Sequence, residues 1–363
     1  MQLGIVGAGH WAQTAHIPSF QKSKGAKIMA ICDTNAKLAE QVAAKFAIPK
    51  VCKDYRELLE LDGINAVDVC TSALSHYEVA REAIQTKRPV LCEKPLAMNV
   101  REARSLWREA SEAKVKTKMG FTFRHSPAFR RMKELISQGF IGEPYLINGF
   151  EQNYQFIKPS TPFRWNPGRN PGELMPGSLE EYAPHIIDIA LWLFGDVRQV
   201  VGNMKNFLPE RLIRETGKMM PINIEDASVW LAEFENGAQG TFQSSFVAVG
   251  GYPGVEARVY GSKGAIIVRL VEEGGINESL KIATAEQPEF RESETPSRFY
   301  GTGQKNDNWI ELCYRNLAQA FVSDILEDRE PEANFLAGVK TQEVEDAVFL
   351  SHRERRWVTL PLP

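Results

Sequence analysis

A short apolar run that ends in two closely spaced glycines constrains the fold more than any other feature of this sequence. Residues Gln2–Val6 lead into Gly7-Ala8-Gly9, and Ala12 completes the spacing Gly-x-Gly-x-x-Ala. At the end of a strand, such glycines permit a tight turn and let a phosphate approach the backbone, where a helix begins with free N–H groups. A glycine turn can also join a strand to a helix without a ligand, so the surrounding pattern decides between these interpretations.

Strand and helix patterns alternate over the first third of the chain. Further apolar runs of strand length lie at 27–32, 66–70, 89–92 and 116–119. Helices are expected at 35–46, 55–61, 76–86 and 100–113, where apolar residues recur at helical spacing. This alternation predicts an α/β fold in which helices cover both faces of a parallel sheet. It supports a dinucleotide-binding Rossmann domain over residues 1–121.

The pattern changes after about residue 120. Longer strands are expected at 145–152, 199–207, 228–234, 240–246, 256–260 and 265–270. Glu235-Asn236-Gly237, between two of these strands, is a strong signal for a tight hairpin. A polar loop is expected at 286–308 and a helix at 309–326. The second domain, residues 122–363, is therefore predicted to be α+β with a mostly antiparallel sheet.

Composition excludes several classes of function. Lys and Arg number 43 against 46 Asp and Glu, and no stretch is strongly basic, so nucleic acid is not an expected partner. No apolar run has the length of a membrane-spanning helix, and the N-terminus shows no export signal, so we expect a cytoplasmic protein without membrane partners. The 5 cysteines form no CxxC pair and the 6 histidines show no ligand spacing, so no metal site is expected.

The residue that ends the second apolar run predicts the cofactor. Asp33 stands where a carboxylate accepts hydrogen bonds from the adenosine ribose hydroxyls of a dinucleotide. Thr34 and Asn35 follow, so no arginine is available for a 2′-phosphate, which Asp33 would also repel. The sequence therefore predicts NAD rather than NADP.

A charged pair follows the apolar run at 89–92. Glu93-Lys94-Pro95 would lie at the carboxyl edge of the parallel sheet, where open α/β sheets bind their ligands. A lysine there can donate a hydrogen bond to a substrate hydroxyl and stabilise developing negative charge. The alternative, which spacing alone favours, is a solvated loop lysine.

A third motif lies in an apolar helix predicted at 183–194. His185 and Asp188 are its only strongly polar residues, and they share a face with Glu181 at helical spacing. A buried histidine oriented by a carboxylate is a candidate general base. The alternative is a core pair of His185 and Asp188 that satisfy each other.

Taken together, these motifs resemble the glucose–fructose oxidoreductase / inositol dehydrogenase / MocA family. The resemblance covers nearly the whole chain, and the combination is far more specific than any single motif. The matching segments are 7–12, Asp33, 75–76, 90–97, 120–124, 141–144, 163–165, 177–179, 185–188, 192–195 and 261–264.

The resemblance implies a Rossmann domain, a C-terminal α/β domain with an open-faced sheet, and an NAD-dependent sugar or inositol dehydrogenase. Such enzymes oxidise a hydroxyl of a sugar or cyclitol, or reduce the ketone. The resemblance makes Lys94 and His185 catalytic, with Glu181 in the place of the family's usual aspartate. Ala183 and Ser72 replace the family's usual glycine and proline.

The resemblance also supplies binding residues. Those expected at the cofactor are Gly7, Gly9, His10, Trp11, Asp33, Thr71, Ser72, His76, Glu93, Lys94, Thr122 and Trp165. Those expected at the substrate are Lys94, Arg124, Tyr154, Arg164, Tyr182 and His185.

Two other functions are compatible with the same residues. An NAD-dependent glycosidase that oxidises its sugar transiently needs the same lysine and histidine. A sugar- or NAD-sensing protein on this scaffold needs neither, and the presence of both Lys94 and His185 argues against it.

The second domain also predicts an oligomeric state. Because this domain has few helices to cover both faces of its sheet, we expect a homodimer or homotetramer.

Overall fold

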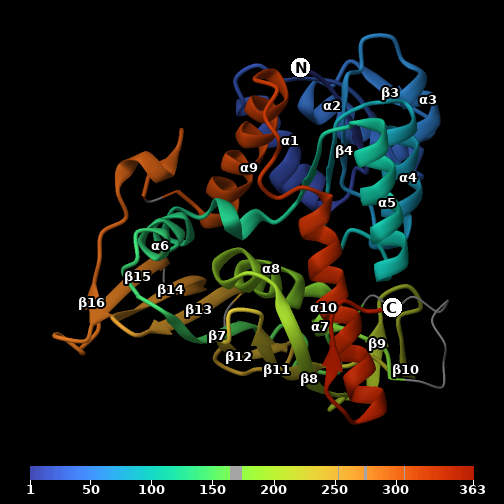
Figure 1. The fold of residues 1–363 in the computed structure, drawn as a ribbon. Helices are drawn as coiled ribbons and strands as arrows, with labels where there is room; N and C mark the ends of the chain where they lie inside the picture. Colours follow the sequence, from blue (N-terminus) through green and yellow to red (C-terminus); the bar gives the residue numbers. More distant parts are fainter. Residues whose placement is uncertain (164–173, 252, 274–275, 306) are drawn as a thin grey trace. The chain divides into compact units, whose positions relative to one another are not determined.

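The structure is a computed structural model that describes all residues except 164–173, 252, 274–275 and 306 (Figure 1). It contains two compact units. The first comprises Met1–Pro127 and Pro296–Gln342, and the second comprises Ala128–Thr295 and Glu343–Pro363. This division differs from the predicted contiguous domains 1–121 and 122–363, because a C-terminal segment packs with the N-terminal unit.

The first unit is built on a six-stranded sheet with the order β3-β2-β1-β4-β5-β6. Its strands, all parallel, are β1 (Gln2–Val6), β2 (Lys27–Cys32), β3 (Lys50–Cys52), β4 (Ala66–Val69), β5 (Val90–Cys92) and β6 (Thr117–Met119). The connecting helices are α1 (Ile17–Lys22), α2 (Ala36–Phe46), α3 (Tyr55–Glu60), α4 (Ala73–Gln85) and α5 (Val100–Ala113). This strand order is that of the Rossmann fold, so the predicted parallel sheet is confirmed.

Side-chain caps explain where several of these helices begin. Asn35 accepts a hydrogen bond from the Leu38 N–H at the start of α2. Asp54 and Asn99 do the same for the first turns of α3 and α5. Each cap satisfies backbone N–H groups that have no partner within the helix, so the short polar residues before the apolar periodicity set these boundaries.

Helix α9 (Trp309–Leu326) belongs to the first unit because it covers the apolar side of α1. Phe20 of α1 meets Phe321 of α9 with ring centroids 6.5 Å apart, and both side chains are buried. Leu317 and Val322 join the same core. The first part of α10 (Phe335–Glu354) also packs in this unit. The expected helix at 309–326 is therefore correct in extent, although the predicted domain division separated it from its core.

A nine-stranded sheet forms the second unit, with the order β16-β15-β14-β13-β7-β12-β11-β8-β17. Its strands are β7 (Pro144–Gln152), β8 (Val197–Lys205), β11 (Ala227–Phe234), β12 (Gln239–Ser245), β13 (Gly254–Gly261), β14 (Gly264–Glu273), β15 (Ile276–Thr284), β16 (Arg291–Glu292) and β17 (Val358–Thr359). The pairings are antiparallel except between β7 and β12. The mostly antiparallel sheet is confirmed, and the hairpin at residues 235–237 joins β11 to β12 as predicted.

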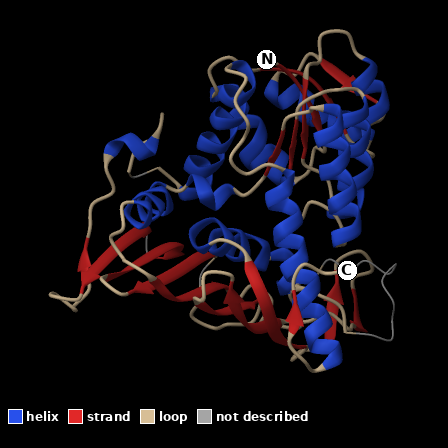
Figure 2. Ribbon diagram, viewed as in Figure 1, coloured by secondary structure: helices blue, strands red, loops and turns tan. Residues whose placement is uncertain are grey.

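Within the described residues, this unit also contains one further hairpin, three further helices and the C-terminal part of α10 from Glu343 onward. Strands β9 (Glu210–Ile213) and β10 (Lys218–Pro221) pair with each other. The helices are α6 (Pro127–Ser137), α7 (Ser178–Glu181) and α8 (Ala183–Phe194). Figure 2 shows α6 and α8 on one side of the large sheet. Ile186 of α8 packs so closely on Gly149 of β7 that a Cβ there would lie 2.4 Å from its side chain.

Candidate active site

The glycine turn after β1 has the geometry that a dinucleotide needs. Gly7 adopts φ +108°, and a Cβ there would lie 2.3 Å from the Cys70 carbonyl oxygen, so no other residue fits. A Cβ at Gly9 would meet nothing within 4 Å, so the backbone of the turn faces open space. Ala12 is fully buried where the helix passes the sheet. An accessible turn at the start of a helix suits a pyrophosphate.

Asp33 is held at the end of β2 by the turn itself. Its Oδ2 accepts a hydrogen bond from the Ala8 N–H at 2.8 Å, and its Oδ1 accepts one from the Asn35 N–H at 2.8 Å. Each carboxylate oxygen has a second lone pair, and the side chain is partly exposed. The fixed carboxylate can therefore still accept hydrogen bonds from ribose hydroxyls.

The helix after the turn begins at His10 and is π-helical over Ala12–His16 before it continues as α1. Trp11, which is 45% exposed, stacks on Tyr314 of α9 with ring centroids 6.0 Å apart and an interplanar angle of 23°. The π-helical turn directs His16 into the core, where it is 1% exposed. Single π-helical turns are common at functional sites.

Lys94 follows β5 at the same edge of the sheet. Its backbone N–H donates to Glu93 Oε2 at 3.2 Å, and its peptide bond to Pro95 is cis. The next carbonyl, that of Pro95, accepts a hydrogen bond from His76 Nδ1 at 2.6 Å. Burial lowers the pKa of His76, so its ring is neutral. Buried groups on both sides therefore fix the backbone around Lys94.

The expected cofactor residues of the first unit fall into two groups. Partly or largely exposed residues follow the carboxyl ends of the strands: Gly9, His10, Trp11, Asp33, Thr71, Ser72 and Lys94. Gly7, His76, Glu93 and Thr122 are buried, the last three with exposed fractions of 1%, 6% and 1%. The side chains of these last three residues support the backbone turns and are not exposed to a ligand. Trp165 and Arg164 lie outside the described residues.

The other expected site residues lie on short helices and one loop. Arg124 is in the first unit, in a 3₁₀ helix over Thr122–His125, and is buried. In the second unit, His185 and Asp188 are buried in α8, whereas Glu181 is exposed at the end of α7. Tyr154 is 47% exposed. The apolar helix predicted at 183–194 is thus a buried helix with a histidine near its start.

The Tyr182 hydroxyl is held between two amide side chains. It accepts a hydrogen bond from Asn153 Nδ2 at 2.7 Å and donates one to Gln155 Oε1 at 3.1 Å. Its ring packs edge-on against Phe246, with centroids 4.8 Å apart. Burial raises the pKa of Tyr182 well above the usual value, so it remains a neutral phenol. These contacts anchor the residue that directly precedes α8.

One supporting residue of the second unit was not predicted from the sequence. The Glu225 carboxylate is fully buried and accepts hydrogen bonds from the Ser178 hydroxyl and from the Leu179 N–H at the start of α7. Ser228 donates to the same carboxylate. Burial raises the pKa of Glu225 to about 7, against these hydrogen bonds, which lower it. The sequence feature that could have indicated Glu225 is an acidic residue directly before an apolar strand.

Profiles of one protein family match both parts of the chain. The profile described as "Oxidoreductase family, NAD-binding Rossmann fold" matches residues 1–121. The profile described as "GFO/IDH/MocA C-terminal domain" matches residues 129–267. The predicted family resemblance is thereby confirmed.

Curated relatives are similar over most of their length. Levoglucosan dehydrogenase from Pseudarthrobacter phenanthrenivorans is 24% identical, over 99% of this chain and 96% of that protein. Myo-inositol 2-dehydrogenase from Thermotoga maritima is 28% identical, over 75% of this chain and 76% of that protein.

Solved structures share the fold. An NAD binding oxidoreductase from Klebsiella pneumoniae superposes with a TM-score of 0.89 at 26% identity and covers 100% of both chains. Levoglucosan dehydrogenase in complex with NADH and L-sorbose has a TM-score of 0.89 at 23% identity and covers 99% of both chains. In the described part of this chain, every helix is too short or too polar to cross a membrane.

Proposed function

This chain belongs to the GFO/IDH/MocA family of oxidoreductases with an NAD-binding Rossmann domain, and from this membership we propose that it is an NAD-dependent sugar or cyclitol dehydrogenase. It would transfer a hydride between nicotinamide and the carbon that carries a secondary hydroxyl. The observation that carries the proposal is one sheet edge with an open glycine turn, a fixed Asp33 and Lys94. The sugar and inositol dehydrogenases among the relatives support the substrate class.

In this proposal, each site residue has a defined task. Bound NAD supplies the hydride acceptor or donor. Lys94 donates a hydrogen bond to the substrate oxygen and stabilises the negative charge that develops there. His185 accepts the hydroxyl proton during oxidation and returns it during reduction. Glu181, four residues before His185 at the end of α7, would tune His185 through its charge, an effect that its exposure to water weakens.

The proposal assigns further contacts to residues that are accessible in their own unit. His10, Trp11, Thr71 and Ser72 would line the dinucleotide, and Tyr154 would contact the substrate. Three residues with buried side chains would act indirectly, by holding backbone turns: His76, Glu93 and Thr122. Arg124 and Tyr182 would shape the substrate pocket rather than react.

A substrate panel tests the proposed function. Purified protein would be mixed with NAD and levoglucosan, inositols, apiose and other sugars, and NADH formation would be followed by absorbance. We expect stoichiometric NADH formation with at least one polyol. Release of an aglycone from a glycoside without net NADH would identify a glycosidase instead.

The cofactor preference is expected to depend on Asp33. Replacing Asp33 by Ser and Thr34 by Arg removes the ribose acceptor and supplies a cation for a 2′-phosphate. The ratio of kcat/KM for NADP over NAD should rise about tenfold or more, because one hydrogen bond to a charged group contributes about 1.5–3 kcal/mol. Asp62→Ser, in an exposed loop, is the control. Equal or tighter binding of NADP by the unmodified protein would contradict this interpretation.

The protein is expected to be a homodimer or homotetramer. On β11, the alternate residues Val229 and Leu231 are 49% and 46% exposed, and Leu146 of β7 is 46% exposed. These strands flank β12, so apolar side chains recur along one face of the sheet. Association would remove this face from water. Light scattering at micromolar concentration should give at least a dimer mass, which Leu231→Glu should reduce. A monomeric unmodified protein would contradict the expectation.

A further inference from the structure

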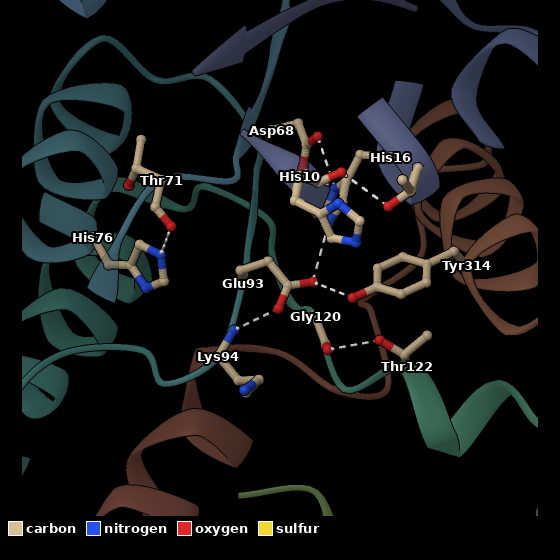
Figure 3. A network of polar contacts seen from close by, with 11 residues as sticks. His10, His16, Asp68, Thr71, His76, Glu93, Lys94, Gly120, Thr122 and Tyr314 are labelled. Atoms are coloured by element: carbon tan, nitrogen blue, oxygen red, sulfur yellow. Dashed lines mark hydrogen bonds and ion pairs between the residues drawn. The ribbon is translucent and has the colours of Figure 1, made fainter. Parts of the chain in front are cut away.

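A chain of buried polar side chains lies behind Lys94 in the first unit (Figure 3). His16 Nδ1 is 2.9 Å from Asp68 Oδ2, and His16 Nε2 is 3.0 Å from Glu93 Oε1. The Tyr314 hydroxyl donates to the same Glu93 oxygen at 3.0 Å. We call these four residues the Glu93 network. They come from the helix after the glycine turn, β4, the end of β5, and α9.

The charged groups of the network are buried away from bulk solvent. Both nitrogens of His16 face carboxylate oxygens, an arrangement that favours the doubly protonated imidazolium. Burial lowers the pKa of His16, but the charges and hydrogen bonds of Asp68 and Cys70 together outweigh burial and raise this pKa well above the usual value. A buried cation beside Glu93 favours the ionised carboxylate, which accepts hydrogen bonds and does not donate them. Glu93 therefore presents acceptor oxygens to all of its neighbours.

The two oxygens of Glu93 have different partners. Oε1 accepts from His16 and Tyr314, and Oε2 accepts from the backbone N–H of Lys94 at 3.2 Å. The opposite side is closed by Gly120, where a Cβ would lie 2.8 Å from Oε1 and 3.0 Å from the Glu93 Cα. The carboxylate thus has little freedom to rotate. Its fixed orientation determines where the Lys94 backbone is held.

We propose that His16 and Tyr314 are positioning residues, which hold the Glu93 carboxylate so that it fixes the backbone of Lys94 for the reaction. The catalytic consequence rests on the proposed function of Lys94, whereas the hydrogen-bond geometry does not. Because Tyr314 stacks on Trp11, the network also connects Lys94 to the helix that opens at the glycine turn. Tyr314 lies far from Lys94 in the sequence, and α9 brings it to the sheet edge.

Tyr314→Phe tests the proposal because it removes the hydroxyl that donates to Glu93 and keeps the ring against Trp11 and His16. The Lys94 amide should exchange hydrogen faster in mass spectrometry of peptides over residues 91–97. We expect kcat to fall about tenfold, which is less than the loss of about 10²-fold that a misplacement of a reacting group by about 1 Å can cause. Affinity for NADH, measured by fluorescence, should remain unchanged.

Two further variants complete the test. Tyr55→Phe, on α3 and outside the network, is the matched control for loss of a hydroxyl and should leave exchange and turnover unchanged. Gly120→Ala displaces the Glu93 carboxylate from its other side and should reproduce the faster exchange and the lower kcat. Unchanged exchange at residues 91–97 in both Tyr314→Phe and Gly120→Ala would overturn the proposal.

Lys94→Ala, assayed in parallel, separates the two possible failures. If Lys94→Ala is inactive but Tyr314→Phe turns over normally despite faster exchange, the positioning role is overturned. If Lys94→Ala is itself fully active, the proposed function of Lys94 fails, and with it the catalytic role of the network. Slow turnover of Tyr314→Phe together with faster hydrogen exchange at residues 91–97 supports the proposal.

Discussion

Replacing Lys94 or His185 by alanine is expected to lower kcat by about 10²–10⁴-fold, the usual contribution of a general acid–base group. NADH affinity should remain nearly unchanged, because neither proposed task involves the phosphates or the adenosine. If both residues act on one substrate oxygen, the double variant should lose less than the product of the two single losses. Initial rates and fluorescence titration with NADH provide the measurements.

Controls make this result specific. Lys37→Ala removes an exposed lysine on α2 and should not change turnover. Glu181→Gln should reduce kcat less than either main variant, because an exposed carboxylate adjusts the charge near His185 without reacting. Near-normal turnover of His185→Ala on the true substrate would leave His185 and Asp188 as a core pair. The base would then be sought first at Glu181, because Tyr182 remains a neutral phenol.

Breaking the buried ion pair of Arg211 and Asp226 is expected to destabilise the second unit by about 3–5 kcal/mol, because one buried charge loses its partner. Arg211 is fully buried, pairs with Asp226, and donates to the Phe156 carbonyl oxygen at 2.8 Å. Its guanidinium also lies 5.0 Å from the centre of the Phe163 ring. Arg211→Met should therefore lower the free energy of unfolding, measured in urea by circular dichroism.

An exposed ion pair provides the comparison for this variant. Arg198 pairs with Glu233 but is 56% exposed, so Arg198→Ala should change the free energy of unfolding by less than about 1 kcal/mol. Adding Asp226→Asn to Arg211→Met removes the unpaired charge and should restore part of the stability. A loss from Arg211→Met as small as that from Arg198→Ala would contradict the expectation.

The predictions from sequence succeeded where local pattern decides structure. The parallel sheet followed from short apolar runs that alternate with amphipathic helices, and the glycine turn followed from its position after the first strand. Asp33 and Lys94 were recognisable because a polar residue that directly follows a buried strand lies at the ligand edge of such a sheet. The hairpin at residues 235–237 followed from turn chemistry alone.

The supporting residues of the candidate site were harder to find. Asp68 did carry a signal, since it is a polar residue inside an otherwise apolar strand and a buried polar group needs a partner, whereas His16 lies in a stretch of mixed polarity. The sequence did not reveal that they bind each other, or that Glu93 turns inward to join them. For the same reason, the sequence did not reveal that the Glu225 carboxylate accepts hydrogen bonds from hydroxyl groups on other elements.

The order of the elements, the type of each sheet and the residues at the strand ends could be predicted from sequence alone, because periodicity, turn residues and the length of the connections are local features. The return of α9 to cover α1, which brings Tyr314 to Glu93, is visible only in the folded chain. Burial of apolar surface drives this packing and does not depend on sequence separation. The partners of a buried polar group are therefore known only once the chain has folded.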